Sequence, residues 1–85
     1  MIVRKPSKEK EEECSAWPVW EKEVSTFPWV YSEKETCLII EGKASVKSDD
    51  GEEIKFGKGD LVEFPAGLKC TWKITEPIKK HYKFG

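Results

Sequence analysis

The fold is decided by the stretch Gly59-Asp60-Leu61-Val62-Glu63-Phe64-Pro65-Ala66-Gly67-Leu68-Lys69-Cys70. Residues 60–64 are mostly apolar and strand-like, and a glycine precedes them. Glycine permits backbone angles that other residues avoid, and the Pro-x-Gly sequence that follows makes a tight bend. The stretch therefore predicts a strand that turns sharply and continues into another strand near Cys70.

Alternating apolar residues continue on both sides of this stretch. Downstream, one face carries Cys70, Trp72 and Ile74, and Pro77 predicts a break before the last residues. Upstream, Asp49-Asp50-Gly51 predicts the turn of a hairpin, and Gly42 a second turn. The faces of the upstream strands are expected to carry Phe27, Trp29 and Tyr31; Glu35, Cys37 and Ile39; Ala44 and Val46; and Ile54 and Phe56. Many short strands with glycine and proline turns indicate an all-β closed barrel.

Composition limits the classes of partner. The chain has 85 residues, of which 15 are basic and 16 acidic, so the charges nearly cancel. No charge field is left to attract nucleic acid or an anionic membrane. No apolar run approaches the roughly 20 residues of a membrane helix. With three cysteines and no visible signal or transit sequence, we expect reduced thiols and a cytoplasmic protein, or the plastid stroma if it is a trimmed plant protein.

The amino-terminal part differs from the rest. Residues 1–16 are densely charged, and Ser7 is placed to cap a short helix that runs to Cys14. We expect this segment to lie over a barrel mouth or to fray, and residues 17–85 to form the barrel. The aromatic arm Trp17-Pro18-Val19-Trp20 is expected to be extended and to pack on the barrel or on a partner subunit.

The spacing of these residues resembles the two sequence motifs of the cupin superfamily, whose fold is a small jelly-roll barrel. The stretch from Gly59 matches the second motif except that Cys70 stands where a histidine is usual. Glu35, seven positions before a glycine, matches the glutamate of the first motif. Trp29 and Tyr31 occupy its two histidine positions.

More narrowly, the chain resembles the small single-domain cupins grouped with ureidoglycine aminohydrolase. The resemblance rests on Trp17-Pro18-Val19-Trp20-Glu21, Tyr31 through Cys37, Ile40-Glu41-Gly42-Lys43, Phe64 through Trp72, and Lys80-His81-Tyr82. It implies a single jelly-roll barrel with a short helix or arm in front of it. A divalent metal held by three histidines and a glutamate is typical of cupins, and only the glutamate is kept here.

The favoured function is the binding of a small metabolite in an aromatic-lined pocket centred on Glu35. Trp29, Tyr31 and Trp72 are predicted as its walls. Glu35 is predicted as a general acid/base or a hydrogen-bond anchor, and Cys70 as a second catalytic candidate. The predicted ligand-binding set is Trp29, Tyr31, Glu35, Cys37, Trp72 and His81.

Three alternatives stay open. A metal-dependent enzyme related to the aminohydrolase would hold its ion with Glu35, Cys70 and His81, although the sequence favours no bound metal. A structural or interaction module would form a homodimer through the arm Trp17–Trp20. The aromatic residues would otherwise fill a barrel too narrow for a ligand. The sequence identifies no cofactor.

Overall fold

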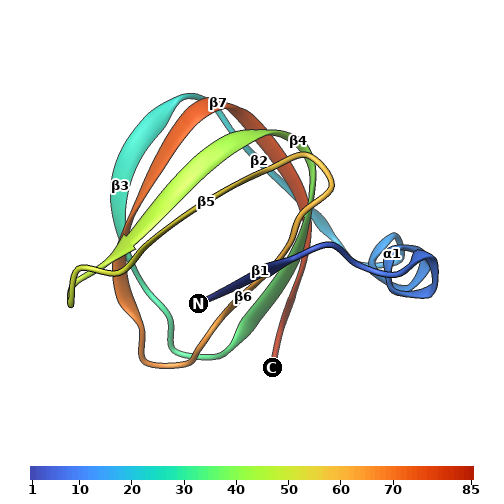
Figure 1. The fold of residues 1–85 in the computed structure, drawn as a ribbon, viewed down its shortest axis with the longest axis horizontal. Helices are drawn as coiled ribbons and strands as arrows, with labels where there is room; N and C mark the ends of the chain where they lie inside the picture. Colours follow the sequence, from blue (N-terminus) through green and yellow to red (C-terminus); the bar gives the residue numbers. More distant parts are fainter.

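Two long strands organise the sheet. The computed structural model describes residues 1–85, and in it β4 (Glu35–Ser48) and β7 (Lys69–Phe84) pair in antiparallel fashion from Glu35 opposite Phe84 to Ser48 opposite Cys70. Both strands carry alternating inward and outward side chains, because successive residues of a strand point to opposite faces. This central pair curves through the whole barrel, and shorter strands extend it on either side (Figure 1).

The shorter strands add to different halves of the central pair. Along β4, the first half pairs with β6 (Leu61–Phe64) and the second half with β5 (Glu53–Gly57). Along β7, the first half pairs with β3 (Ser25–Val30) and the second with β2 (Val19–Lys22). β1 (Ile2–Arg4) pairs with the outer edge of β6. The prediction of an all-β jelly-roll barrel is confirmed.

The predicted hairpin and the predicted breaks have different outcomes. The hairpin is confirmed, because β4 pairs with β5 around the turn at residues 49–51. The breaks at Gly42 and Pro77 were wrong: both residues lie inside the long strands, at a β-bulge where the register shifts. Gly42 has a φ of 90°, and a Cβ there would overlap the carbonyl oxygen of Pro77. The two strands bend at this point without ending.

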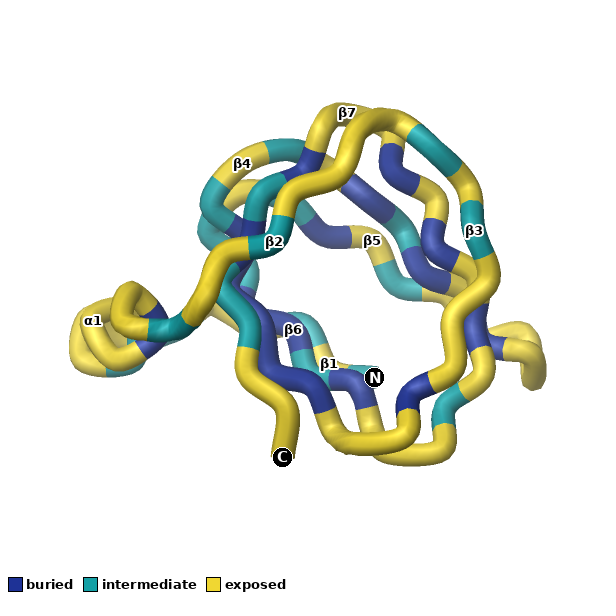
Figure 2. The backbone as a smooth tube through the Cα atoms, turned by 180° about the vertical axis from the view of Figure 1, so that it is seen from behind, coloured by how far each residue is buried: buried dark blue, intermediate teal, exposed yellow.

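The core fills the barrel from the inside. Three of its aromatic side chains are Trp72, Phe64 and Phe56, whose rings meet at centroid distances of 5.4–6.2 Å. Figure 2 shows buried residues alternating with exposed ones along the first half of β7, as expected for a sheet with one face in the core. The first residues of β4 are buried without alternation. The buried cluster comprises Tyr31, Cys37, Ile39, Ala44, Val46, Phe56, Val62, Phe64, Cys70, Trp72, Ile74 and Ile78.

A second small core lies outside the barrel. The helix α1 (Lys8–Cys14) begins after Ser7, whose Oγ accepts a hydrogen bond from the backbone N–H of Lys10 at 3.2 Å, so the predicted cap is confirmed. Cys14 packs with Leu38 and Leu61, which point away from the barrel interior. The helix therefore covers the outer wall and not a mouth (Figure 1). It is not long and apolar enough to cross a membrane.

The sheet also includes residues ahead of the predicted barrel boundary. β1 at residues 2–4 is hydrogen-bonded to β6, so the barrel does not begin at residue 17. The arm Trp17–Trp20 is extended as predicted from Val19 onward, where it forms β2. It packs on its own barrel, because β2 pairs with β7 of the same chain.

Candidate functional site

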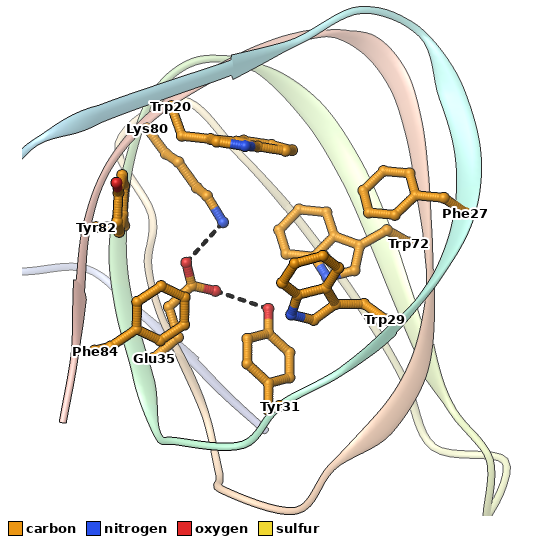
Figure 3. A pocket seen from close by; sticks show the side chains of 9 residues that line it. All are labelled: Trp20, Phe27, Trp29, Tyr31, Glu35, Trp72, Lys80, Tyr82 and Phe84. Carbon is orange, nitrogen blue, oxygen red and sulfur yellow. Dashed lines mark hydrogen bonds and ion pairs between the residues drawn. The ribbon is translucent and has the colours of Figure 1, made fainter.

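One cavity opens into the interior of the barrel. It has a volume of about 180 Å³, and seven of its nine lining residues are hydrophobic (Figure 3). Trp29 and Phe84 are 46% and 42% exposed, so they form the rim. The lining residues are Trp20, Phe27, Trp29, Tyr31, Glu35, Trp72, Lys80, Tyr82 and Phe84.

Strand alternation places these side chains in the cavity. On β7 the even-numbered residues point inward on both sides of Pro77, which puts Trp72, Lys80, Tyr82 and Phe84 on the same face. On β3 the odd-numbered Phe27 and Trp29 point toward them. The register Phe27 opposite Trp72 stacks those two rings, with a centroid distance of 6.1 Å and an interplanar angle of 9°.

The polar groups of the cavity form one hydrogen-bonded chain. The Tyr31 hydroxyl donates to Glu35 Oε1 at 2.7 Å, and Lys80 Nζ donates to Glu35 Oε2 at 2.9 Å (Figure 3). The side chains of Glu35 and Lys80 are 3% and 6% exposed. A buried charge is tolerated when it is paired and hydrogen-bonded, and here both carboxylate oxygens have a donor.

The turn that decides the fold also holds Tyr31 in place. The backbone N–H of Tyr31 donates to the carbonyl of Leu68 at 2.9 Å, and its carbonyl accepts from the N–H of Gly67 at 2.6 Å. The Tyr31 ring stacks on Phe64 with a centroid distance of 5.0 Å. These contacts fix the hydroxyl beside Glu35.

Burial keeps the Tyr31 hydroxyl protonated. Burial raises the pKa of Tyr31 far above its usual value, and the negative charge of Glu35 adds to this shift. The hydrogen bond that Tyr31 donates to the carboxylate acts in the same direction. Tyr31 is therefore a permanent hydrogen-bond donor to Glu35 near neutral pH.

Lys80 presents unused donors to the cavity. Its Nζ lies 4.5 Å from the ring centroid of Trp72 and 4.8 Å from that of Trp20. An ammonium group has three N–H donors, and Glu35 is the acceptor of one of them. The others lie among aromatic rings, which stabilise the cation by their quadrupoles and offer no strong acceptor. A ligand oxygen in the cavity can take this place.

The barrel fold agrees with the comparisons with known proteins. The model of the EutQ-like cupin domain matches residues 9–82. This chain belongs to the EutQ-like cupin family. A DUF861 family protein from Thermotoga maritima is 50% identical, with a TM-score of 0.95, and the match covers 99% of this cupin and 98% of that chain. None of the curated proteins compared with this cupin matches it.

More distant structures share the fold alone. EutQ from Clostridium difficile is 23% identical with a TM-score of 0.71, and the match covers 78% of this cupin and 52% of EutQ. A DUF861 family protein from Pseudomonas syringae is 24% identical with the same TM-score, over 79% of this cupin and 29% of that chain. This cupin spans about half the length of EutQ.

The residues expected in the pocket fall into two groups. Trp29, Tyr31, Glu35 and Trp72 line the cavity of this cupin. Cys37, Cys70 and His81 do not line it, although both cysteines are buried in the barrel.

The two cysteines are held as thiols. Burial raises the pKa of Cys37 to about 12. Burial also raises the pKa of Cys70, whose Sγ donates to the carbonyl of Trp29 at 3.5 Å. The thiolate is the nucleophilic form of cysteine, and burial disfavours it in both residues. They pack as small apolar side chains.

His81 points away from the cavity. Its Nδ1 lies 2.9 Å from the carbonyl oxygen of Trp17, on the outer side of β7. The odd position of His81 explains this, since its neighbour Lys80 points inward. No three side chains of His, Cys, Asp or Glu in this cupin are grouped as metal ligands.

The donor set of the cavity does not fit the divalent metal that cupins typically hold. Glu35 is the one carboxylate, and the Lys80 ammonium lies beside it where a metal cation would have to bind. The tryptophan indole cannot ligate, and the Tyr31 hydroxyl keeps its proton. The set Glu35, Cys70 and His81, named from sequence for a metal, is not brought together.

Sequence reasoning missed the second charged residue of the cavity. The even-numbered parity of Trp72 and Ile74 resumes at Ile78 and Lys80 after the exposed Glu76, so the signal was present on β7. The expected break at Pro77 hid it, because a break resets the alternation. Trp20, Phe27, Tyr82 and Phe84 were also not named as lining residues, and β2, β3 and β7 carry them into the cavity.

Proposed function

We propose that this cupin binds a small, compact, uncharged metabolite in its barrel cavity, with Lys80 and Glu35 as the polar anchor. The observation that carries the proposal is the single polar chain of Tyr31, Glu35 and Lys80 in an otherwise aromatic cavity. A largely apolar cavity with a few convergent polar groups is the usual form of a small-molecule site.

The size of the cavity supports a ligand of about one ring. Its volume of about 180 Å³ is slightly larger than the engineered cavity of roughly 150 Å³ that binds benzene. The aromatic walls provide flat apolar surfaces on which a planar ligand can stack, and Trp29 and Phe84 at the rim lie where it enters.

The charge balance supports an uncharged ligand that carries a hydrogen-bond acceptor. The cation of Lys80 and the anion of Glu35 neutralise each other inside the cavity. A charged ligand would leave one net charge buried in an aromatic environment, which is unfavourable. A carbonyl oxygen, by contrast, accepts an unused N–H of Lys80 without disturbing the ion pair.

A matched set of probes tests the proposal. Benzamide, benzoate, benzylammonium and toluene have nearly the same shape and differ in charge and in acceptors. Binding is followed by NMR through the four indole N–H signals, because Trp20, Trp29 and Trp72 line the cavity and Trp17 does not. We expect benzamide to bind best and to shift the first three signals while that of Trp17 stays in place.

Paired variants identify the anchor. The double variant Glu35→Gln/Lys80→Met removes both buried charges at nearly constant volume, and it should lose the preference for benzamide over toluene. The control Glu21→Gln/Lys79→Met removes a surface ion pair whose atoms are 3.5 Å apart, outside the cavity. It should bind like the wild type. A cavity that binds none of the four probes would refute the proposal.

The alternative of a metal-dependent enzyme related to ureidoglycine aminohydrolase has less support. It needs ligands beside Glu35, and the carboxylate already has Lys80 and Tyr31 as partners. Elemental analysis of protein purified without chelators tests it directly. One transition-metal ion per chain would favour this alternative over the proposed binding of an uncharged ligand.

A further inference from the structure

We propose that Lys80 is a reactive lysine, which captures small aldehydes and ketones as a protonated imine. The inference rests on the proposed binding cavity and assigns a covalent reaction to it. Its basis is the location of the Lys80 amine in an aromatic cavity. This amine is hydrogen-bonded to the carboxylate of Glu35, which also accepts a hydrogen bond from the Tyr31 hydroxyl.

The surroundings of Lys80 differ from those of a surface lysine. Its side chain is 6% exposed and lies against Trp20 and Trp72, whereas the side chain of Lys79 is 38% exposed and pairs with Glu21. Lysines that attack carbonyl groups in proteins often lie in apolar pockets. The amine of Lys80 lies in such a pocket, and the amine of Lys79 lies outside it.

Glu35 is placed to take the proton that blocks attack. Its Oε2 lies 2.9 Å from Lys80 Nζ, within the range needed for direct proton transfer. The transfer converts the buried ion pair into a neutral amine and a neutral acid, with no change of net charge in the cavity. The nitrogen lone pair is then free to form a bond to the carbonyl carbon of the bound ligand.

The remaining steps involve only the amine of Lys80, the carboxyl group of Glu35 and the carbonyl group of the ligand. Attack opens the C=O double bond, and the oxygen takes up one proton from the nitrogen and one from Glu35 before it leaves as water. The nitrogen lone pair forms the C=N bond, which gives a protonated imine with one positive charge. Ammonium and carbonyl compound have thus become iminium and water, with no net change of charge. The iminium then forms the ion pair with Glu35 in place of the ammonium. The Tyr31 hydroxyl holds the carboxylate in position through its hydrogen bond to Oε1 at 2.7 Å.

Reductive trapping tests the inference on the intact chain. The protein is incubated with benzaldehyde and cyanoborohydride, and the modified lysines are identified by peptide mapping with tandem mass spectrometry. Lys79 is an internal control in the same peptide, because it is adjacent in sequence but outside the cavity. We expect Lys80 to be modified at least about tenfold faster than Lys79 despite its burial.

Two further measurements separate cavity chemistry from chance modification. Added benzamide should slow the modification of Lys80 and leave that of Lys79 unchanged. Glu35→Gln should slow the modification of Lys80, and Glu21→Gln, the matched change beside Lys79, should not. Circular dichroism checks that the Glu35 variant is folded. If it is not, the comparison of Lys80 with Lys79 in the wild type decides alone.

The outcomes distinguish this inference from the function on which it rests. If benzamide shifts the indole signals but benzaldehyde modifies Lys80 no faster than Lys79, the imine reaction is refuted and the binding function stands. If benzamide does not bind and Lys80 is not modified, both are refuted. Selective modification of Lys80 that benzamide suppresses supports both.

Discussion

At the scale of single residues, the site depends on three side chains that stabilise one another. Glu35 is a buried anion whose two oxygens each accept one hydrogen bond, from Tyr31 and from Lys80. Removing either donor leaves a buried charge with fewer partners, and that change costs more than the interaction contributes in the intact chain. The site is therefore sensitive to conservative substitutions.

Tyr31→Phe removes one hydroxyl and little volume. The lost hydrogen bond is to a charged group, so we expect the free energy of unfolding to fall by about 1.5–3 kcal/mol. Urea denaturation at neutral pH measures the change. Tyr82→Phe is the control, because Tyr82 also lines the cavity but its hydroxyl does not contact Glu35. Equal losses in the two variants would contradict the role given to Tyr31.

The stabilities of the wild type and of Tyr31→Phe should depend differently on pH. The pKa of Tyr31 is raised by burial, so the folded chain keeps this proton at a pH at which the unfolded chain releases it. The wild type should therefore lose stability as the pH rises above about 10, the usual pKa of tyrosine. Tyr31→Phe should lose less over the same range. Cys37, whose pKa of about 12 also makes stability fall at high pH, is common to both and cancels in the comparison.

At the scale of elements, the bulge between β4 and β7 lets each of these two strands continue through both halves of the barrel. Gly42 and Pro77 lie opposite each other where the register shifts. Trp72 lies before this bend on β7 and Lys80 lies after it, and both side chains face the same cavity. The chemistry of the site therefore depends on a backbone feature that carries no functional group.

Gly42→Ala tests this feature. The residue has a φ of 90°, and the new Cβ would meet the backbone of Pro77 and Ile78. We expect the free energy of unfolding to fall by more than about 3 kcal/mol, because backbone strain and a steric clash add. Thermal unfolding followed by circular dichroism measures it.

Gly51→Ala is the matched control for that substitution. Gly51 has a φ of 98°, and a Cβ there would meet no atom within 4 Å. It should lose only the roughly 1–2 kcal/mol of the unfavourable backbone conformation. If the two alanine variants are equally stable, the close approach of Gly42 to Pro77 does not contribute to the free energy of unfolding.

At the scale of the whole molecule, the amino-terminal segment completes the barrel from outside. β1 covers the edge of β6, and α1 buries Cys14 against Leu38 and Leu61 on the outer wall. Deletion of residues 1–16 should lower the free energy of unfolding by about 3 kcal/mol, because two leucine side chains become exposed. Calorimetry measures the loss, and light scattering detects association through the uncovered edge.

A shorter deletion separates the two contributions. Removal of residues 1–6 takes away β1 and leaves the helix with its Ser7 cap. It should uncover the edge of β6 with a smaller loss of stability. Unchanged stability after the longer deletion would instead mean that residues 17–85 fold without the amino-terminal segment. The same scattering experiment on the wild type tests the predicted homodimer.

The barrel and the aromatic part of the site could be predicted before the structure was known. Turn residues and a period of two predict strands from local information, and the resemblance to the cupin motifs around Glu35 and from Gly59 implies how the strands are arranged. Parity groups Trp29 with Tyr31 and Cys70 with Trp72 on the same faces. The strand predictions succeeded because each depends on neighbours within a few residues along the chain.

The polar side chains of the cavity could be identified only from the pairing of strands that are far apart in the chain. Lys80 lies 45 residues from Glu35 in the chain and 2.9 Å from it in space, because β4 and β7 pair along their whole length. His81 faces outward, and Cys70 is a buried thiol beside Trp29. The physical reason is how the bulge divides its residues between the two strands. β7 keeps its even-numbered residues inward on both sides of Pro77, whereas the inward residues of β4 change from odd-numbered before Gly42 to even-numbered after it. Because β7 keeps its alternation, Lys80 faces Glu35.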